Sequence, residues 1–364
     1  MGQLACMASR FSTMRRNNTT RFMHSMLSVV DDNALPEEAG VDASIHKAKP
    51  LNVGVVLTPD FSLMSFSSLT EPLRGANRMD GGRPYRWTNM SVDGGPVRSS
   101  TGLEVPTIAL DEGAELDIVV VCGGHSDETY GSRKLREYLR QMDRRKIRIG
   151  SVSTGSFVLA DAGLLDGRRC TTHWGYIDAL RAACSRAEVC DELYVVDGRI
   201  FTCAGGLAAM DAMLDIIRNR QGIGFAGMVA ENFIYGSDRR PEDRQRMALR
   251  HRLGVAHPNL IGAVAVMEEF IETPLRLPKI ASRTGVSTRQ LERLFRRHLG
   301  CSPAQHYVRI RLDEGRRLLR HTSMSVLEIA ILCGFNSTSH FSRSYRQRFD
   351  ILPSADRTWK GVPR

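Results

Sequence analysis

The chain has 364 residues, of which 42% are hydrophobic and 25% are charged, a composition typical of a soluble globular protein. A chain of this length favours two domains with a core each. No apolar run reaches the roughly 18 residues that a membrane span needs, so we expect no membrane partner. The eight cysteines form no CxxC pair. Scattered thiols favour a reduced, cytoplasmic protein, and we expect neither a metal nor another cofactor.

The net charge of +10 is concentrated near the C-terminus. Residues 257–364 carry 18 basic and 9 acidic side chains, whereas residues 51–256 carry 26 of each. A local excess this large predicts a polyanionic partner for the last third of the chain, and we expect nucleic acid. The alternative is a surface that is basic only for solubility, but solubility does not require the charge to segregate along the chain.

The pattern along the chain divides it into four segments. Residues 1–50 show no sustained periodicity and are expected to form a flexible leader. Residues 51–236 alternate short apolar strands with helices, and the charged residues 237–257 are expected to be a linker. Residues 258–364 show only helical periodicity. We therefore predict an α/β domain followed by an all-α domain.

The α/β segment is expected to form a parallel sheet that helices cover on both faces. Continuous β-branched runs predict strands that are buried on both sides. The expected strands are 53–57, 117–122, 147–152 and a hairpin over 193–202 that turns at Asp197-Gly198, and the expected helices are 63–79, 135–142, 156–162 and 207–218.

The all-α segment contains an internal repeat. Ile280-Ala281 with Gly285 recurs 49 positions later as Ile329-Ala330 with Gly334. Each glycine is expected to supply the positive φ of a turn between two helices, which predicts a doubled helix-turn-helix. A helix over 303–321 would join the two units and hold them about 34 Å apart, one turn of duplex DNA. Two units in register favour a DNA-binding surface over basic helices that merely face solvent.

The second helix of each unit has one apolar face and one polar, basic face. A capping box of Ser287 and Gln290 is expected to begin the first of these helices, and Asn336 is the N-cap candidate of the other. Guanidinium, amide and hydroxyl groups on the polar faces are the chemistry that contacts base edges and phosphates. The residues expected to bind DNA are Ser287, Thr288, Arg289, Gln290, Arg293, Arg297, Asn336, Ser337, Thr338, Ser339, His340, Arg343 and Arg346.

Two motifs carry a resemblance to a known family. They are Ile280-Ala281-x3-Gly285-Val286-Ser287-x2-Gln290-Leu291 and Ile329-Ala330-x3-Gly334-Phe335-x5-Phe341-Ser342-Arg343-x-Tyr345. Through them, residues 258–359 resemble the DNA-binding domain of the AraC/XylS family of transcription regulators. The resemblance implies sequence-specific binding to promoter DNA, with RNA polymerase as a candidate partner and activation as the commoner direction of control. Asp350 stands where the family usually has glycine, so we expect a different turn after the second unit.

The α/β segment contains a candidate nucleophile elbow. Ser151-Val152-Ser153-Thr154-Gly155 follows a predicted strand and opens a helix, although the first glycine of the usual motif is missing. Gly123 and Gly124 end the neighbouring strand, where their N–H groups are candidates to bind an anion. His173 is a candidate base for Ser153, which leaves a hydrolase open as a function. The alternative is that Ser153 is only a small residue in a tight turn.

Further segments carry a second resemblance. They are Val120-Val121-Cys122-Gly123-Gly124, Ser153-Thr154-Gly155-Ser156, Thr171-Thr172-His173-Trp174 and Ala204-Gly205-Gly206. Through them, residues 51–236 resemble the PfpI-type, class I glutamine amidotransferase-like domain, which implies a flavodoxin-like sandwich. Catalytic relatives have cysteine at the position of Ser153. The resemblance therefore implies a vestigial elbow in a domain that senses a ligand and is not an enzyme.

Residues 61–66 and 71–78 resemble the branch of such regulators that controls catabolism of arginine, carnitine and glycine betaine, effectors that share a carboxylate and a cationic nitrogen. The helix N-terminus at residues 154–156 is the expected carboxylate site. Trp174, Tyr176, Tyr85 and Trp87 are cation–π candidates. The expected effector site comprises Glu71, Gly123, Gly124, Ser153, Thr154, Gly155, His173 and Trp174. We also expect this domain to form a homodimer.

Three functions thus stay open from the sequence. The first, which we favour, is a transcription regulator that binds promoter DNA and responds to a small-molecule effector. The second is an amidase or protease-like hydrolase that uses Ser153 and His173 and carries a nucleic-acid anchor. The third is an architectural DNA-binding protein, which steep salt dependence without any sequence preference would indicate.

Overall fold

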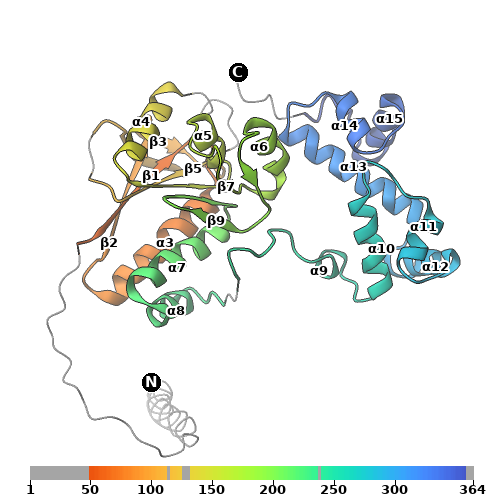
Figure 1. Ribbon diagram of the computed structural model, residues 1–364, viewed down its shortest axis with the longest axis horizontal. Coiled ribbons are helices and arrows are strands. Elements are labelled where there is room, and N and C mark those ends of the chain that lie inside the picture. The colour runs from red at the N-terminus through yellow and green to blue at the C-terminus, as the bar shows by residue number, and fades with distance from the viewer. Residues whose placement is uncertain (1–48, 113–114, 125–131, 237–238, 358–364) are drawn as a thin grey trace, which may run out of the picture. The chain divides into compact units, whose positions relative to one another are not determined.

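The computed structural model describes residues 49–112, 115–124, 132–236 and 239–357 (Figure 1). The expected leader over residues 1–50 lies almost entirely outside these ranges, as does the C-terminal end of the predicted DNA-binding segment. In the described ranges, no helix combines the length and the apolar character that a bilayer span requires.

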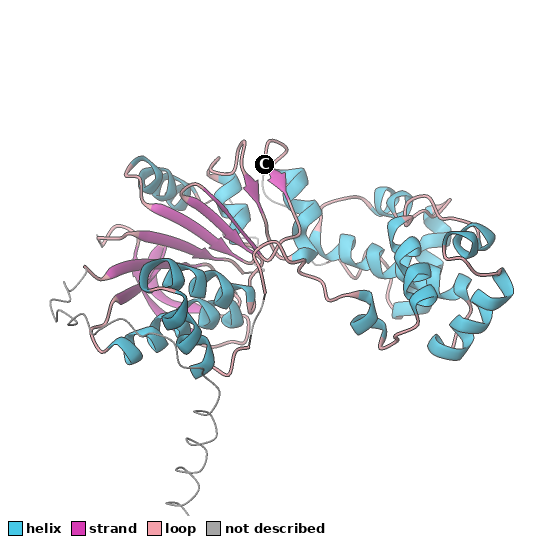
Figure 2. Ribbon diagram, turned by 60° about the horizontal axis from the view of Figure 1, so that its bottom comes forward, coloured by secondary structure: helices cyan, strands magenta, loops and turns pink. Residues whose placement is uncertain are grey.

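The α/β part is built around a mixed sheet (Figure 2). Its strands are β1 (Leu51–Leu57), β2 (Tyr85–Ser91), β3 (Asp93–Arg98), β4 (Glu104–Ala109), β5 (Ile118–Cys122), β6 (Arg148–Val152), β9 (Tyr194–Asp197) and β10 (Ile200–Cys203). They lie in the order β3-β4-β2-β1-β5-β6-β10-β9. Pairing is parallel from β4 to β10, and β3 and β9 add antiparallel edges. The predicted parallel sheet and its terminal hairpin are confirmed.

Helices cover both faces of this sheet (Figure 1). On one face pack α3 (Leu63–Asp80), α7 (Ala208–Gln221) and α8 (Ile223–Asn232); on the other pack α4 (Arg133–Arg144), α5 (Gly155–Asp161) and α6 (Ile177–Ala183). Because successive side chains of a strand point to opposite faces, Val55 joins the first core and Val56 joins the second. Both are fully buried, as the continuous apolar run predicts. A short strand pair, β7 (Arg169–Cys170) with β8 (Glu188–Val189), lies outside the main sheet.

The last part of the described chain is helical. Its helices are α9 (Leu249–Leu253), α10 (Pro258–Glu269), α11 (Leu277–Arg283), α12 (Thr288–Leu299), α13 (Pro303–His321), α14 (Val326–Leu332) and α15 (Thr338–Phe349). One core joins α10, α11 and α12 with Tyr307 from the first half of α13. A second core joins α14 and α15 with Leu312, Leu318 and Leu319 from the second half of α13. Each core holds one helix-turn-helix unit, so the predicted doubled motif is confirmed.

Candidate DNA-binding surface and effector site

The turn before each recognition helix, α12 or α15, is built around a glycine. Gly285 has φ 68° and Gly334 has φ 70°, a left-handed conformation that costs glycine little. Gly334 is also closely packed, because a Cβ atom there would lie 2.5 Å from the carbonyl oxygen of Ile271. Both predicted turn glycines are confirmed, and a side chain at Gly334 would meet strain and a clash together.

A serine begins each recognition helix. Ser287 Oγ accepts a hydrogen bond from Gln290 N at 3.2 Å, and Gln290 Oε1 accepts one from Ser287 N at 2.9 Å, which completes the predicted capping box. In the second unit the N-cap is Ser337, whose Oγ accepts from His340 N at 3.2 Å. The prediction of Asn336 as the N-cap was wrong, because the second unit has one more residue between the turn glycine and the helix.

A set of free basic groups lies on the outer faces of the two recognition helices. Six arginines are exposed and form no ion pair with another residue in the described ranges: Arg289, Arg293, Arg296, Arg297, Arg343 and Arg346. Their guanidinium groups are free to meet phosphates and base edges. The cap leaves Gln290 only its Nε2 atom for a base, since its Oε1 atom already serves Ser287.

Other arginines of the helical part are used within the fold. Arg316 and Arg320 donate to the buried carboxylate of Asp356 at 2.8 and 2.7 Å. Arg311 donates to the carbonyl oxygens of Cys333 and Gly334 at 2.7 and 2.6 Å. These arginines stabilise the second helix-turn-helix unit, in contrast to the six arginines on the recognition helices.

The predicted elbow exists as a strained turn at the carboxyl end of β6. Ser153 is buried and has φ 58°, which is uncommon for a residue other than glycine. Its N–H donates to the carbonyl oxygen of Cys203 at 3.0 Å, and its own carbonyl oxygen accepts from Thr172 Oγ1 at 2.9 Å. No side chain caps the first turn of α5, which begins two residues later at Gly155.

Gly123 and Gly124 lie beside the elbow, but their N–H groups are used inside the fold. Gly123 N donates to the carbonyl oxygen of Val152 at 3.2 Å, and Gly124 N donates to Thr58 Oγ1 at 3.0 Å. The prediction that these N–H groups bind an anion was therefore wrong. Gly123 is required for space, because a Cβ atom there would lie 2.0 Å from Gly155 N.

His173 precedes the short 3-10 helix η2 (Trp174–Tyr176), and its ring caps that helix. Its Nδ1 atom accepts a hydrogen bond from Gly175 N at 3.2 Å, so the proton of the neutral imidazole sits on Nε2. In a Ser-His-Asp triad, Nδ1 instead carries the proton and donates it to a carboxylate. A backbone N–H therefore contacts the Nδ1 atom of this imidazole.

The other predicted effector residues do not gather around the elbow. Glu71 accepts two hydrogen bonds from Arg74, one turn further along α3, at 2.8 and 2.6 Å. The Trp174 ring is 38% exposed, and the guanidinium of Arg246 already lies 5.2 Å from the ring centroid. Among the further aromatic candidates, Tyr85 and Tyr176 are buried in the core. The structure thus brings Gly123 and Gly124 together with the elbow residues 153–155, and the hydrogen bond from Thr172 to Ser153 joins the segment that contains His173 to them.

Two serines at the elbow were missed by sequence reasoning. Ser65 Oγ accepts a hydrogen bond from Gly206 N at 2.8 Å and donates to Ser62 Oγ at 3.0 Å. A Cβ atom at Gly205 would lie 2.8 Å from both Ser65 Oγ and Ser153 Cβ, so Ser65 and Ser153 flank the same glycine. Both missed residues fall within residues 61–66, the segment that carried a family resemblance but no chemical motif.

Two cysteines lie at the ends of the strands next to the elbow. Cys122 and Cys203 are fully buried. Burial raises the pKa of the Cys203 thiol to about 12 and raises the pKa of Cys122 strongly as well. Because the thiolate is the nucleophile, thiols that resist ionisation this strongly are inert at neutral pH.

An α/β sandwich followed by two helix-turn-helix units with free arginines defines a DNA-binding transcription regulator. Comparison with known proteins supports this class: residues 280–358 match the helix-turn-helix domain model and residues 52–219 match the DJ-1/PfpI family model. The chain belongs to the AraC family of transcription regulators, in the branch whose first domain is of the DJ-1/PfpI type.

Two curated relatives come from Pseudomonas aeruginosa. The chain is 42% identical over 309 residues to the HTH-type transcriptional regulator GbdR, a match that covers 85% of this chain and 84% of that protein. It is 44% identical over 303 residues to the HTH-type transcriptional regulator CdhR, covering 83% and 90%. A solved AraC family transcriptional regulator from Pseudomonas putida is 28% identical with a TM-score of 0.48, covering 50% of this chain and 100% of that one.

Proposed function

We propose that this regulator works in the cytoplasm as a homodimer and activates transcription together with RNA polymerase. It responds to a small metabolite that carries a carboxylate and a cationic nitrogen, as glycine betaine, carnitine and arginine do. The observation that carries its DNA binding is the set of six unpaired, exposed arginines on α12 and α15. Their placement on both recognition helices supports two major-groove contacts per chain.

The DNA contacts divide by chemistry. Arg289, Arg293 and Arg343 carry the planar, forked donors that recognise guanine, whereas the hydroxyl groups of Thr338 and Ser339 serve phosphates. Binding of a promoter fragment and a scrambled competitor, measured with the full chain over a salt series, tests this. Preference for the promoter at every salt concentration supports a sequence-specific regulator. Equal affinity for both fragments would indicate an architectural protein instead.

The proposed effector site is the elbow together with its neighbours. The first-turn N–H groups of α5, at Gly155 and Ser156, have no side-chain cap and suit a carboxylate. The hydroxyl group of Ser65 and the Cβ atom of Ser153 flank Gly205, next to this helix start. Glu71 is left out of this site because its carboxylate pairs with Arg74, and Gly123 and Gly124 because their N–H groups are used.

A hydrogen-bonded path leads from this site toward the DNA-binding helices. Thr172 donates to the elbow carbonyl of Ser153, and the carbonyl oxygen of Thr172 accepts from Gln245 Nε2 at 2.8 Å. Gln245 belongs to the segment 239–248 that precedes α9. An effector that binds one arrangement of the elbow more tightly would increase the population of that arrangement. The segment with Gln245 would follow this change, and with it the response at the promoter.

We further propose that the domain has no hydrolase activity. Ser153 replaces the nucleophilic cysteine of the resembled enzymes, and the nearby Cys122 and Cys203 are too hard to ionise to take over its role. The Nδ1 atom of His173 accepts a hydrogen bond from a backbone N–H, whereas in a Ser-His-Asp triad that atom carries the proton. The variant Ser153→Ala separates the two functions: a sensor changes its dose response, and a hydrolase loses its turnover.

The decisive experiment is calorimetry on the full chain. Glycine betaine, carnitine and arginine are titrated separately, with acetate and tetramethylammonium as controls that carry only one of the two charged groups. Saturable heat from one zwitterion, weakened at least tenfold by Ser153→Ala, supports the proposed site. No heat from any of the three, or equal heat from acetate, would refute the proposed effector class.

A further inference from the structure

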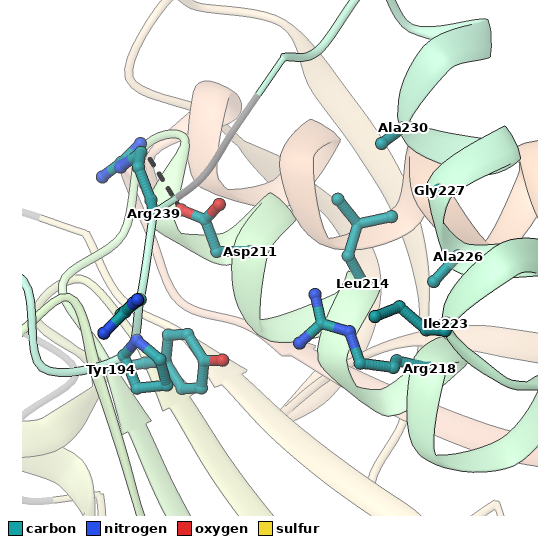
Figure 3. A pocket seen from close by; sticks show the side chains of 11 residues that line it. Tyr194, Asp211, Leu214, Arg218, Ile223, Ala226, Gly227, Ala230 and Arg239 are labelled. Carbon is teal, nitrogen blue, oxygen red and sulfur yellow. Dashed lines mark ion pairs between the residues drawn. The ribbon is translucent and has the colours of Figure 1, made fainter.

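A pocket of about 380 Å³ opens between α7, α8 and the segment that follows α8 (Figure 3). None of its lining residues belongs to the elbow. The residues that line it are Tyr194, Asp211, Leu214, Arg218, Ile223, Ala226, Gly227, Ala230, Arg239, Arg240 and Pro241. Its volume lies in the range of small-molecule sites.

One wall of the pocket is charged, and its ion pairs leave a positive excess. The buried carboxylate of Asp211 pairs with Arg239 at 3.4 Å and accepts from Tyr235 Oη at 2.8 Å, so Asp211 and Arg239 neutralise each other (Figure 3). Arg218 pairs with Asp215 at 3.1 Å and still lines the pocket. Arg240 is exposed and forms no ion pair with any residue in the described ranges.

The rest of the lining is mainly apolar. Leu214, which lies between Asp211 and Arg218 on α7, and Ala226 are buried, and Ile223 is 76% exposed. Gly227 faces open space, because a Cβ atom there would have no heavy atom within 4 Å. The lining thus combines a neutral ion pair, one unpaired guanidinium and apolar side chains. This combination fits a small anion that carries a short hydrocarbon chain.

We propose that this pocket binds a small organic acid, a carboxylate on a short apolar chain. Arg240 and Arg218 hold the carboxylate, and Leu214 and Ala226 contact the chain. The ligand differs in charge from the zwitterions proposed for the elbow, so this inference stands apart from the proposed effector. A bound ligand would contact α7, α8 and the segment that contains Arg240. This segment is already joined to the sheet, because the carbonyl oxygen of Pro241 accepts a hydrogen bond from Leu193 N at 3.0 Å.

The test uses hexanoate as the probe and the full chain as the receptor. Calorimetry is expected to show saturable binding of hexanoate and at least tenfold weaker binding of hexanamide, which has the same chain and no charge. Inorganic phosphate is expected to bind at least tenfold more weakly, since it lacks the apolar body. Absence of hexanoate binding at millimolar concentration, or equal affinity for either control compound, would overturn the proposal.

Matched variants locate the binding. Gly227→Leu fills the pocket, and its control Gly224→Leu places the same side chain on the same helix, where open space also surrounds the Cβ position outside the pocket. Arg240→Gln removes the free cation, and the exposed Arg250→Gln is its control. Both pocket variants are expected to weaken hexanoate at least tenfold and both controls less than twofold. Binding that Gly227→Leu and Arg240→Gln leave intact would overturn the proposal, because Arg240 is exposed and its replacement leaves the fold unstrained.

Discussion

Gln245 Nε2 lies 2.8 Å from the carbonyl oxygen of Thr172, the residue whose hydroxyl donates to the elbow carbonyl of Ser153. The same nitrogen lies 2.9 Å from both Thr171 Oγ1 and the carbonyl oxygen of Glu192. Two oxygens of main-chain carbonyls require a donor here, so the amide orientation is fixed. One side chain thereby joins the elbow to the segment that precedes the DNA-binding helices.

Gln245→Glu is expected to uncouple the effector from transcription. A carboxylate oxygen would replace the donating nitrogen and face two carbonyl oxygens, which costs more than the about 1–3 kcal/mol of a neutral unmade hydrogen bond. A promoter–reporter assay should show a dose response flattened at least fivefold, while the affinity for promoter DNA without effector changes less than twofold. Glu242→Gln, an exposed change in the same segment, is the control. A normal dose response from Gln245→Glu would show that this contact carries no signal.

Arg293→Ala and Arg343→Ala should each weaken promoter binding by about 1–3 kcal/mol, if each guanidinium contacts a base. Because neither arginine forms an ion pair within the described residues, its replacement should change the free energy of unfolding little. Competition with promoter variants checks the assignment, because preference should relax at one base pair for each residue. Uniform weakening on all sequences, with a salt slope reduced by about one, would assign the residue to phosphate. Arg309→Ala, on α13 outside both recognition helices, is the control.

The sequence predicted those elements whose apolar pattern is continuous and missed those whose pattern is mixed. Strands β1 and β5 are central, and residues 53–57 and 118–122 are buried, which gives each strand a run of apolar residues. Strand β2 escaped prediction because Arg86, Thr88 and Asn89 interrupt its apolar positions. The edge strand β3 contains Gly94-Gly95-Pro96, a sequence that usually indicates a turn.

At the sites, local chemistry was predictable and distant chemistry was not. The capping box of Ser287 and the strained turn at Ser153 depend on residues within three positions, so the sequence shows them directly. The N–H of Gly124 is taken by Thr58, which is 66 positions away, and no local pattern could reveal that. The hydrogen bond from Gln245 to Thr172 joins residues 73 positions apart, and it escaped prediction for the same reason.

Asp350→Gly is expected to stabilise the protein by about 1 kcal/mol. Asp350 ends α15 with φ 57° and ψ 19°, nearly the conformation of Gly300 at the end of α12, which has φ 64° and ψ 13°. The expected difference in this turn is therefore absent, and aspartate adopts a left-handed conformation that glycine takes at less cost. Urea unfolding of the full chain measures the change. The reverse substitution Gly300→Asp should destabilise by a similar amount, and a change of the same sign in both variants would contradict the argument.

Asp356 is expected to anchor the end of the second helix-turn-helix unit. It is 6% exposed, accepts from Tyr345 Oη at 2.7 Å and pairs with Arg316 and Arg320. Asp356→Asn should cost about 3 kcal/mol at pH 7, because it leaves two guanidinium groups facing a neutral amide. Urea unfolding measures this, with Asp313→Asn as the control. The side chain of Asp313 is 54% exposed in its ion pair with Arg348, so the loss of that pair should cost less than about 1 kcal/mol.

The same carboxylate predicts a dependence on pH. Burial opposes ionisation of Asp356, but the hydrogen bonds from Tyr345 and Arg320 and the charge of Arg316 outweigh it and hold its pKa below the ordinary value. Since the folded pKa is below the unfolded one, near 4, the stabilisation is complete above about pH 4 and is lost as the pH falls through the folded value. The difference in unfolding free energy between wild type and Asp356→Asn should therefore be constant from pH 7 to pH 5 and shrink below pH 4. A difference that grows on acidification would mean that the carboxyl group is neutral in the folded protein.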